Sequence, residues 1–152
     1  MAEYKVRWIT ENLAAGYAPL SYADLEAIKE QSIDTIVNLC AEFCDFQEIE
    51  RNTGFEVYYL PIVDECSPDI EEMEKAFAWL DEAVMRGKKV LVHCRFGIGR
   101  TSTFVTAYLL RRGLSLKDVS KKLKGTLPTP PSYSQRRFLK KYAEKLSAVK
   151  TR

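Results

Sequence analysis

The sequence predicts an α/β protein whose central sheet is largely parallel. Short, mostly apolar runs alternate with longer segments of helical periodicity, and this alternation is typical of strands joined by helical crossovers. The run KKVLVHC at residues 88–94 is nearly all apolar, as expected of a strand buried on both faces. Residues 100–110 follow it with a helical pattern. A strand-to-helix turn is therefore predicted between them.

The first half of the chain is expected to hold four strands and two helices. Ser21 is a preferred helix cap, and apolar residues follow it at helical spacing. Phe43, Phe46 and Ile49 recur every third residue before Gly54, which indicates a further helix of modest length. The predicted strands are residues 6–9, 13–17, 33–40 and 55–63, and the predicted helices are residues 22–31 and 41–54.

The second half is expected to be mainly helical. Pro68 and Asp69 open a long helix that ends at Arg86 and Gly87. The apolar stripe of this helix consists of Ile70, Met73, Phe77, Leu80 and Val84. Two more helices are predicted over residues 114–125 and 132–146, separated by the proline-rich hinge LPTPPS. No repeat or linker divides the chain, so we expect one catalytic domain over residues 1–152.

Composition and charge place the chain among ordinary globular proteins. Of 152 residues, 46% are hydrophobic and 29% are charged, and the formal net charge is +2. The basic residues near the end of the chain are interpreted as a solvated helix face rather than a nucleic-acid site. No apolar run is long enough for a signal peptide or a membrane span. We therefore expect a cytoplasmic monomer with no nucleic-acid or membrane partner.

The stretch HCRFGIGRT, residues 93–101, occupies the predicted strand-to-helix turn. A glycine-containing loop before a helix start can aim backbone N–H groups and partial positive charge at one point, which suits an anion of phosphate shape. Arg100 adds a planar fork for two oxygens of such an anion. Cys94, at the base of these amides, is expected to persist as a thiolate near neutral pH.

These residue types together indicate phosphoryl transfer to sulfur. Attack of Cys94 on phosphorus would give a cysteinyl-phosphate that water then hydrolyses, with the loop amides and Arg100 stabilising the equatorial oxygens. Thr101 would donate a hydrogen bond to the sulfur, and His93 would orient the loop from behind. The residues expected to contact the substrate are Arg95, Phe96, Gly97, Ile98 and Gly99. A lone cysteine is usually a small buried residue, but the combined spacing favours the catalytic interpretation.

The stretch HCRFGIGRTS resembles the signature H-C-x5-R-S/T of the cysteine-dependent protein tyrosine phosphatase superfamily, and the short chain is similar to small atypical dual-specificity phosphatases. This resemblance implies a phosphatase fold: a central, mostly parallel mixed sheet flanked by helices, with the phosphate-binding loop between a buried strand and a helix. It implies hydrolysis of phosphotyrosine, and of phosphoserine or phosphothreonine, in phosphorylated proteins or peptides. No cofactor and no metal are expected.

The segment YLPIVDECSPD resembles the loop that carries the general acid of this superfamily, about thirty residues before the cysteine. The matching residue is Asp64, and Pro61 and Pro68 bracket the loop. An acid on such a loop can protonate the leaving oxygen and then activate water as a base. Glu65 and Asp69 are neighbouring alternatives, and any of these acids would otherwise cap a helix or be solvated.

Departures from the family pattern bear on mechanism and substrate. The larger tyrosine-specific members place a water-positioning glutamine after the helices, where this chain has PPSYSQ, with Pro131 nearest and Gln135 offset. Gln135, a backbone group or Asp64 alone are the alternatives for orienting the water. The added N-terminal segment of deep phosphotyrosine pockets is not found in this sequence, which implies a shallower site. The loop also lacks the lysines of phosphoinositide-directed members.

Other functions fit the sequence less well. A phospho-binding module without turnover would be expected to lack Cys94, Arg100 or Asp64, and all three are present. Low-molecular-weight phosphatases and arsenate reductases carry their C-x5-R motif near the N-terminus. Metal binding is disfavoured because His93 is the sole histidine and no C-x2-C pair exists. A weak phospho-binding module, or a phosphatase of non-protein phosphomonoesters such as lipids, is the alternative function.

The other cysteines raise a redox question. Without a secretory signal, a disulfide framework is not expected, and most of the four cysteines, Cys40, Cys44, Cys66 and Cys94, are expected to be reduced thiols. Cys40 ends a predicted strand and Cys66 lies in the predicted acid loop, so either is a candidate to trap an oxidised Cys94 as a disulfide. Buried structural thiols are the favoured interpretation.

Overall fold

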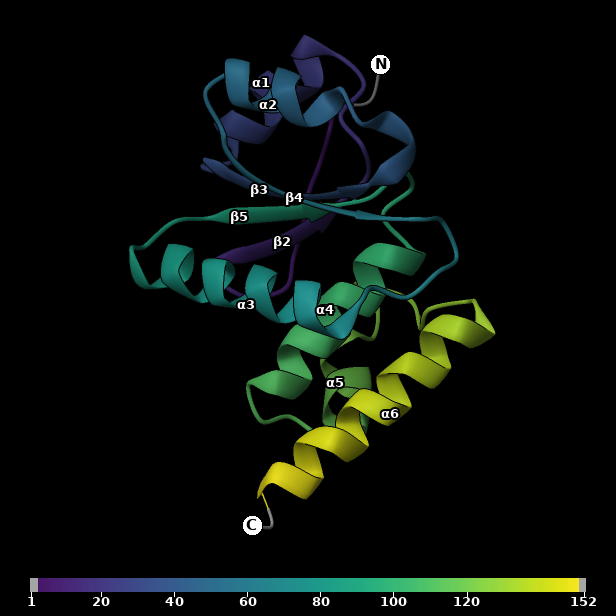
Figure 1. Cartoon of the computed structure of the whole chain (residues 1–152). Coiled ribbons are helices and arrows are strands. Elements are labelled where there is room, and N and C mark those ends of the chain that lie inside the picture. Colours follow the sequence, from purple (N-terminus) through teal and green to yellow (C-terminus); the bar gives the residue numbers. More distant parts are fainter. Residues whose placement is uncertain (1–2, 151–152) are drawn as a thin grey trace.

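A five-stranded mixed sheet forms the centre of the computed structural model, which describes residues 3–150 (Figure 1). The strands are β1 (Arg7–Trp8), β2 (Leu13–Gly16), β3 (Thr35–Cys40), β4 (Glu56–Ile62) and β5 (Val90–His93). Their order across the sheet is β1-β2-β5-β3-β4, and the β1–β2 pair alone is antiparallel within this sheet. The largely parallel α/β sheet that the sequence predicts is confirmed.

Helices cover both faces of this sheet. In Figure 1, α1 and α2 lie on one face, while α3, α4, α5 and α6 lie on the other. Their bounds are α1 (Tyr22–Glu30), α2 (Phe46–Asn52), α3 (Ile70–Met85), α4 (Gly99–Arg111), α5 (Leu116–Leu123) and α6 (Tyr133–Lys150), and a short 3-10 turn, η1 (Ala41–Phe43), precedes α2.

Each face of the sheet carries its own hydrophobic core, because successive residues of a strand point to opposite sides. Ile36 and Leu91 pack with Ile28 of α1 on one side. Val92 packs in the second core, which includes Phe77 of α3. All five side chains are fully buried, and burial of a large apolar side chain contributes roughly 1.5–3 kcal/mol. The central strand β5 is thus held from both faces.

Four helices begin with a side-chain cap. Ser21, Asp69, Ser115 and Ser132 each accept a hydrogen bond of 3.1 Å from the backbone N–H three residues later. Such caps typically contribute about 1 kcal/mol each. The cap at Asp69 fixes the start of α3 and therefore the end of the loop that precedes it.

The prediction of one continuous helix over residues 41–54 is wrong, because this segment is split into η1 and α2. The chain turns at Cys44 and Asp45 between these two pieces. A spacing of three residues fits a 3-10 turn as well as an α-helix. The rings of Phe43 and Phe46 stack across the break with centroids 4.7 Å apart, so the predicted apolar pair survives without a continuous helix.

The buried stripe of α3 differs in part from the expected one. Met73, Phe77 and Leu80 are fully buried as predicted. The stripe continues through alanines at positions 76 and 83, whereas the predicted end members Ile70 and Val84 are half-buried. The helix rotates by 100° per residue, so positions 76 and 83 lie on the face that meets the sheet.

The central strand β5 ends between two parallel neighbours. His93 is paired with Gly16 of β2 on one side and with Asn38 of β3 on the other. Open α/β sheets bind their ligands outside the carboxyl ends of such strands. The loop that follows His93 therefore lies at the functional edge of the sheet.

Candidate active site

A tight loop of residues 94–98 joins β5 to α4, and its backbone path requires glycine. Gly97 has a φ of +74°, and a Cβ atom there would lie 2.6 Å from the carbonyl oxygen of Gly16. The loop is also joined to the end of β2 by a hydrogen bond of 3.0 Å from the Ala18 N–H to the Arg95 carbonyl. These contacts hold the loop against the carboxyl ends of the strands.

The sulfur of Cys94 lies at the base of this loop. Cys94 is 2% exposed, and its Sγ accepts a hydrogen bond of 3.1 Å from the Thr101 hydroxyl. Thr101 lies in the first turn of α4, whose unpaired N–H groups and partial positive charge point toward the loop. The sequence placed both residues here, and the structure brings their side chains into contact.

Arg100 is 1% exposed and is held by a carboxylate that the sequence analysis missed. Its Nη1 and Nη2 donate to the two carboxylate oxygens of Glu42, at 2.6 and 2.8 Å, and Nη1 also donates to the Ile62 carbonyl at 2.8 Å. These bonds use three of the five N–H groups of a guanidinium. The Nε–H has no hydrogen-bond partner within residues 3–150. With the second N–H of Nη2, it forms a free edge that can bind two anion oxygens.

The Arg100–Glu42 pair keeps both groups charged. Burial alone would lower the pKa of Arg100, but the hydrogen bonds to Glu42 raise it above its ordinary value. The same hydrogen bonds lower the pKa of Glu42 to about 2. Glu42 follows directly after β3, the parallel neighbour of β5. Its place after that strand puts it at the same edge of the sheet as the loop of residues 94–98, hereafter the Cys94 loop, but no local pattern shows that it meets Arg100.

Behind the loop lies a buried polar network. His93 contacts the Cys94 carbonyl through Nδ1 at 3.1 Å and a carboxylate oxygen of Glu50 through Nε2 at 2.6 Å. The other oxygen of Glu50 accepts a bond of 2.9 Å from the Asn38 side chain. The two ring nitrogens of His93 thus each contact an oxygen, one from Cys94 and one from Glu50, which fixes the orientation of the ring. The network ties α2 and β3 to the start of the Cys94 loop.

The acid loop between β4 and α3 places Asp64 at the rim of the site. Its side chain is 62% exposed, and one carboxylate oxygen lies 3.6 Å from Arg100 Nε. That oxygen also accepts a hydrogen bond of 3.0 Å from the Glu65 N–H, and Glu65 has a φ of +65°. Asp69, the third candidate acid, caps α3 instead. Asp64 and Glu65 therefore remain as candidates.

Gln135, at the start of α6, completes the wall of the site. It is fully buried, and its side-chain Oε1 has no hydrogen-bond partner within residues 3–150. Its Nε2 donates to the Cys66 carbonyl at 3.3 Å. A Cβ atom on Gly99 would lie 3.1 Å from the amide of Gln135, so the small residue lets the two segments meet. Gln135, which the sequence left as one of several alternatives for orienting the water, therefore lines the cavity.

One cavity unites most of the expected residues. It is lined by Asp64, Glu65, Cys94, Phe96, Ile98, Gly99, Arg100, Pro131 and Gln135. Two residues expected to contact substrate, Arg95 and Gly97, are not part of its lining. Gly97 faces Gly16. The Arg95 guanidinium lies between the rings of Phe43 and Phe96, 5.3 and 5.0 Å from their centroids.

The remaining cysteines form no disulfide within residues 3–150. Cys40 is buried at the end of β3, and its burial and its hydrogen bond with Glu42 raise the pKa of its thiol to about 12. Such a thiol is protonated at neutral pH and is a weak nucleophile. The expectation of a buried thiol is confirmed for Cys40 and wrong for Cys66, which is exposed.

Among the residues that the structure describes, no three side chains of His, Cys, Asp or Glu are gathered in a way that would hold a metal ion. Over the same residues, none of the helices has the length and apolar character needed to cross a membrane.

The structure is similar to solved protein tyrosine phosphatases. Tk-PTP in its active form superposes with a TM-score of 0.79 at 29% identity, covering 91% of this chain and 96% of that chain. Kinase associated phosphatase, with its catalytic-site cysteine substituted by serine, gives a TM-score of 0.82 at 19% identity. It covers 97% of this chain and 98% of that chain. The fold is therefore the protein tyrosine phosphatase fold.

Sequence comparisons define the family more closely. A family model described as a polymorphic toxin system DSP-PTPase phosphatase matches residues 15–114. Dual specificity phosphatase 28 from Homo sapiens is 33% identical over 135 residues, covering 85% of this chain and 75% of the relative. Dual specificity protein phosphatase 9 from Homo sapiens is 35% identical over 112 residues, covering 72% of this chain and 28% of the relative. The chain belongs to the dual-specificity phosphatase family, as the resemblance of HCRFGIGRTS implies.

Replacing Glu42 by glutamine tests the pair with Arg100. The folded-state pKa of about 2 lies below the ordinary 4.5, so the pair stabilises the fold above pH 4.5 and this stability is lost as the pH falls toward 2. We expect Glu42→Gln to lower the free energy of unfolding by about 1–3 kcal/mol at pH 7, because a buried charge loses its partner. Urea unfolding between pH 7 and pH 3 measures this difference.

The matched control is Glu56→Gln, because Glu56 pairs with Arg86 at 3.1 Å where both side chains are more than 40% exposed. Exposed pairs contribute about 0–1 kcal/mol. A loss of stability in Glu42→Gln that is equally large at pH 7 and pH 3 would contradict the charge pairing.

Proposed function

We propose that this chain is a cysteine-dependent phosphatase that removes phosphate from phosphotyrosine, and from phosphoserine or phosphothreonine, in proteins through a cysteinyl-phosphate intermediate. The observation that carries the proposal is the geometry around Cys94. Its sulfur accepts a hydrogen bond from Thr101 at the base of the loop, and the free edge of Arg100 faces the same cavity. The curated relatives, which are named dual specificity phosphatases, support the same class of substrate.

In the first step, the Cys94 thiolate attacks phosphorus, so that an S–P bond forms as the P–O bond to the leaving group breaks. The loop amides, the start of α4 and the free edge of Arg100 stabilise the equatorial oxygens of the transition state. Glu42 acts as a positioning residue, because it binds the opposite edge of the guanidinium. Asp64 gives a proton to the leaving oxygen from the rim of the cavity.

In the second step, water attacks phosphorus and the S–P bond breaks. Thr101 stabilises the departing thiolate through its hydrogen bond to the sulfur. Asp64, now unprotonated, takes a proton from the water. We assign the orientation of this water to Gln135, because its buried Oε1 has no hydrogen-bond partner within residues 3–150 and can accept a hydrogen bond from a water in the cavity. Pro131, the nearest sequence match to the family glutamine, lines the cavity without a side-chain acceptor.

Residues around the sulfur favour a single phosphate on a partly apolar group. Phe96 and Ile98 are exposed apolar residues of the cavity rim. The Cys94 loop contains no lysine for a second phosphate. One catalytic domain over residues 1–152, a cytoplasmic location, a monomeric state and the absence of nucleic-acid or membrane partners stay predictions.

Replacing Cys94 by serine tests the nucleophile. We expect wild-type protein to hydrolyse para-nitrophenyl phosphate in the presence of a chelator, and Cys94→Ser to lose turnover by at least about 10³-fold while it still binds phosphate. Steady-state assays and calorimetric titration with phosphate measure the two properties. A wild type that binds phosphate without turnover would favour the phospho-binding alternative.

Asp64→Asn tests the role of Asp64 as general acid, because the loss of kcat should depend on how much the leaving group needs a proton. We expect Asp64→Asn to lower kcat by about 10²-fold or more for phenyl phosphate, whose leaving group needs a proton, and far less for para-nitrophenyl phosphate. Glu65→Gln is the matched control at the neighbouring position. Equal losses for both substrates in Asp64→Asn, with a leaving-group effect in Glu65→Gln instead, would move the acid role to Glu65.

Gln135→Ala separates the two chemical steps. If Gln135 orients the second water, the intermediate accumulates, and stopped-flow traces show a burst of nitrophenol followed by a steady rate about 10-fold below that of wild type. Ser134→Ala, at the exposed neighbouring position, is the control. A burst phase that slows as much as the steady rate would show that Gln135 acts only on the fold of the cavity.

A further inference from the structure

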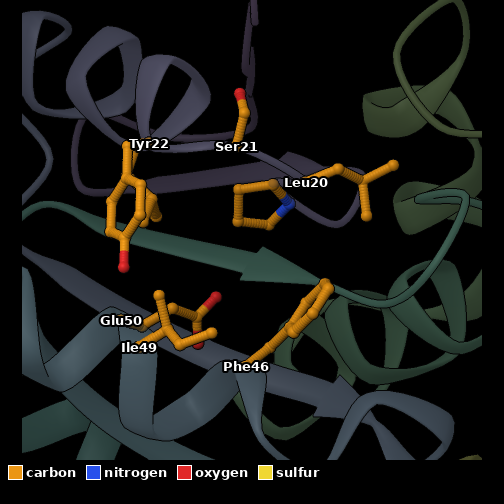
Figure 2. A pocket seen from close by; sticks show the side chains of 8 residues that line it. Leu20, Ser21, Tyr22, Phe46, Ile49 and Glu50 are labelled. Carbon is orange, nitrogen blue, oxygen red and sulfur yellow. The ribbon is translucent and has the colours of Figure 1, made fainter.

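A second, largely apolar groove lies outside the catalytic cavity. It runs between the segment that leads into α1 and the helix α2 (Figure 2). Leu20 and Tyr22 form one wall, and Phe46 and Ile49 form the other. Leu20 is 68% exposed and Tyr22 is 70% exposed. Large apolar side chains exposed together around a hollow are typical of a binding surface.

A run of planar groups connects this groove to the catalytic cavity. Phe96 lines the cavity, and the Arg95 guanidinium lies 5.0 Å from its ring centroid. The same guanidinium lies 5.3 Å from the centroid of Phe43. Phe43 in turn stacks on Phe46 at 4.7 Å, and Phe46 lines the groove. The two hollows are therefore joined by a continuous surface of rings and one guanidinium.

The groove is also fixed relative to the Cys94 loop. Its floor contains Glu50, whose carboxylate contacts His93, the residue before Cys94, at 2.6 Å. On the opposite wall, Ala18 directly precedes the groove-lining segment and donates to the Arg95 carbonyl at 3.0 Å. A group bound in the groove therefore lies at a constant offset from the Cys94 sulfur.

We propose that this groove binds a large apolar side chain of the phosphorylated polypeptide itself, at a residue displaced along the chain from the phosphorylated one. The proposal rests on the proposed function and names a feature of its substrate. An extended segment with its phosphate in the loop would cross Phe96, Arg95 and Phe43, where peptide groups can lie flat on rings and guanidinium. Its apolar side chain would then enter between Leu20 and Phe46.

The chemistry of the lining favours a polypeptide over a phospholipid surface. Among the described residues that line the groove, there is no lysine or arginine, and the one charged residue is the acidic Glu50. Anionic lipid surfaces are bound by clusters of basic residues. A leucine, isoleucine, methionine or phenylalanine side chain instead suits the apolar walls.

Matched phosphopeptides test the proposal. The probes are phosphotyrosine peptides with alanine at every flanking position, in which a single leucine is moved from one position to the next. For wild-type protein, we expect leucine at one position to raise kcat/KM by about 10-fold over alanine, mainly by lowering KM. The ratio of the two kcat/KM values is the readout, because any effect on the chemical steps cancels in it.

Variants of Leu20, an exposed residue of the groove wall, test whether the leucine preference arises in the groove. We expect Leu20→Ser to reduce the leucine-to-alanine ratio to below about 3-fold and the conservative Leu20→Met to keep it. The control is Met85→Ser at the end of α3, where Met85 is 88% exposed and lies outside both hollows. This control is expected to retain the wild-type ratio.

The outcomes distinguish this proposal from the proposed function. Hydrolysis of the phosphopeptides at equal rates wherever leucine is placed would overturn the groove proposal and leave the phosphatase function standing. A leucine preference that Leu20→Ser does not reduce would also overturn it. Binding to phosphatidylserine vesicles that Leu20→Ser abolishes, without any leucine preference, would assign the groove to lipid instead. No hydrolysis of para-nitrophenyl phosphate or of any peptide would overturn both proposals.

Discussion

The ion pair between Arg100 and Glu42 is the constraint on which the site depends. A guanidinium has two edges that can each bind a pair of oxygens, and Glu42 occupies one of them. The Nε–H of the other edge has no hydrogen-bond partner within residues 3–150 and lies 3.6 Å from an Asp64 carboxylate oxygen at the cavity that contains Cys94. A buried arginine without Glu42 would carry an uncompensated charge and would lack a defined orientation. Glu42 thus supplies both the charge balance and the geometry.

The site combines a rigid base with an exposed rim. Buried hydrogen bonds hold Cys94, the proposed nucleophile: His93 contacts its carbonyl and Glu50, and Thr101 of α4 donates to its sulfur. The candidate acid, in contrast, lies on an exposed loop. That loop is joined to the start of α6, where the Ser132 hydroxyl donates to the Glu65 carbonyl at 2.7 Å. This division suits a reaction in which sulfur must be fixed while an acid serves two successive steps.

The proposed catalytic cavity and the proposed substrate-binding groove lie at different parts of the same sheet edge. The cavity around Cys94 is built from the β5–α4 loop, the acid loop and the start of α6. The apolar groove is built from the β2–α1 segment and α2, on the other face of the sheet (Figure 1). Arg95, expected to contact the substrate, lies between the rings that connect these two regions. Arg95 is therefore placed to contact a polypeptide that spans both hollows.

The sequence by itself determined the parts that depend on neighbouring residues. The alternation of strands and helices, the cap at Ser21, and the loop with Cys94, Arg100 and Thr101 all follow from local spacing. Only the tertiary structure decided that Glu42, 58 residues before Arg100, holds the guanidinium. It also decided that Gln135 reaches the cavity. These contacts form because parallel strands and packed helices bring segments that are distant in the sequence to one edge of the sheet. The local sequence pattern around each residue does not show which residues meet there.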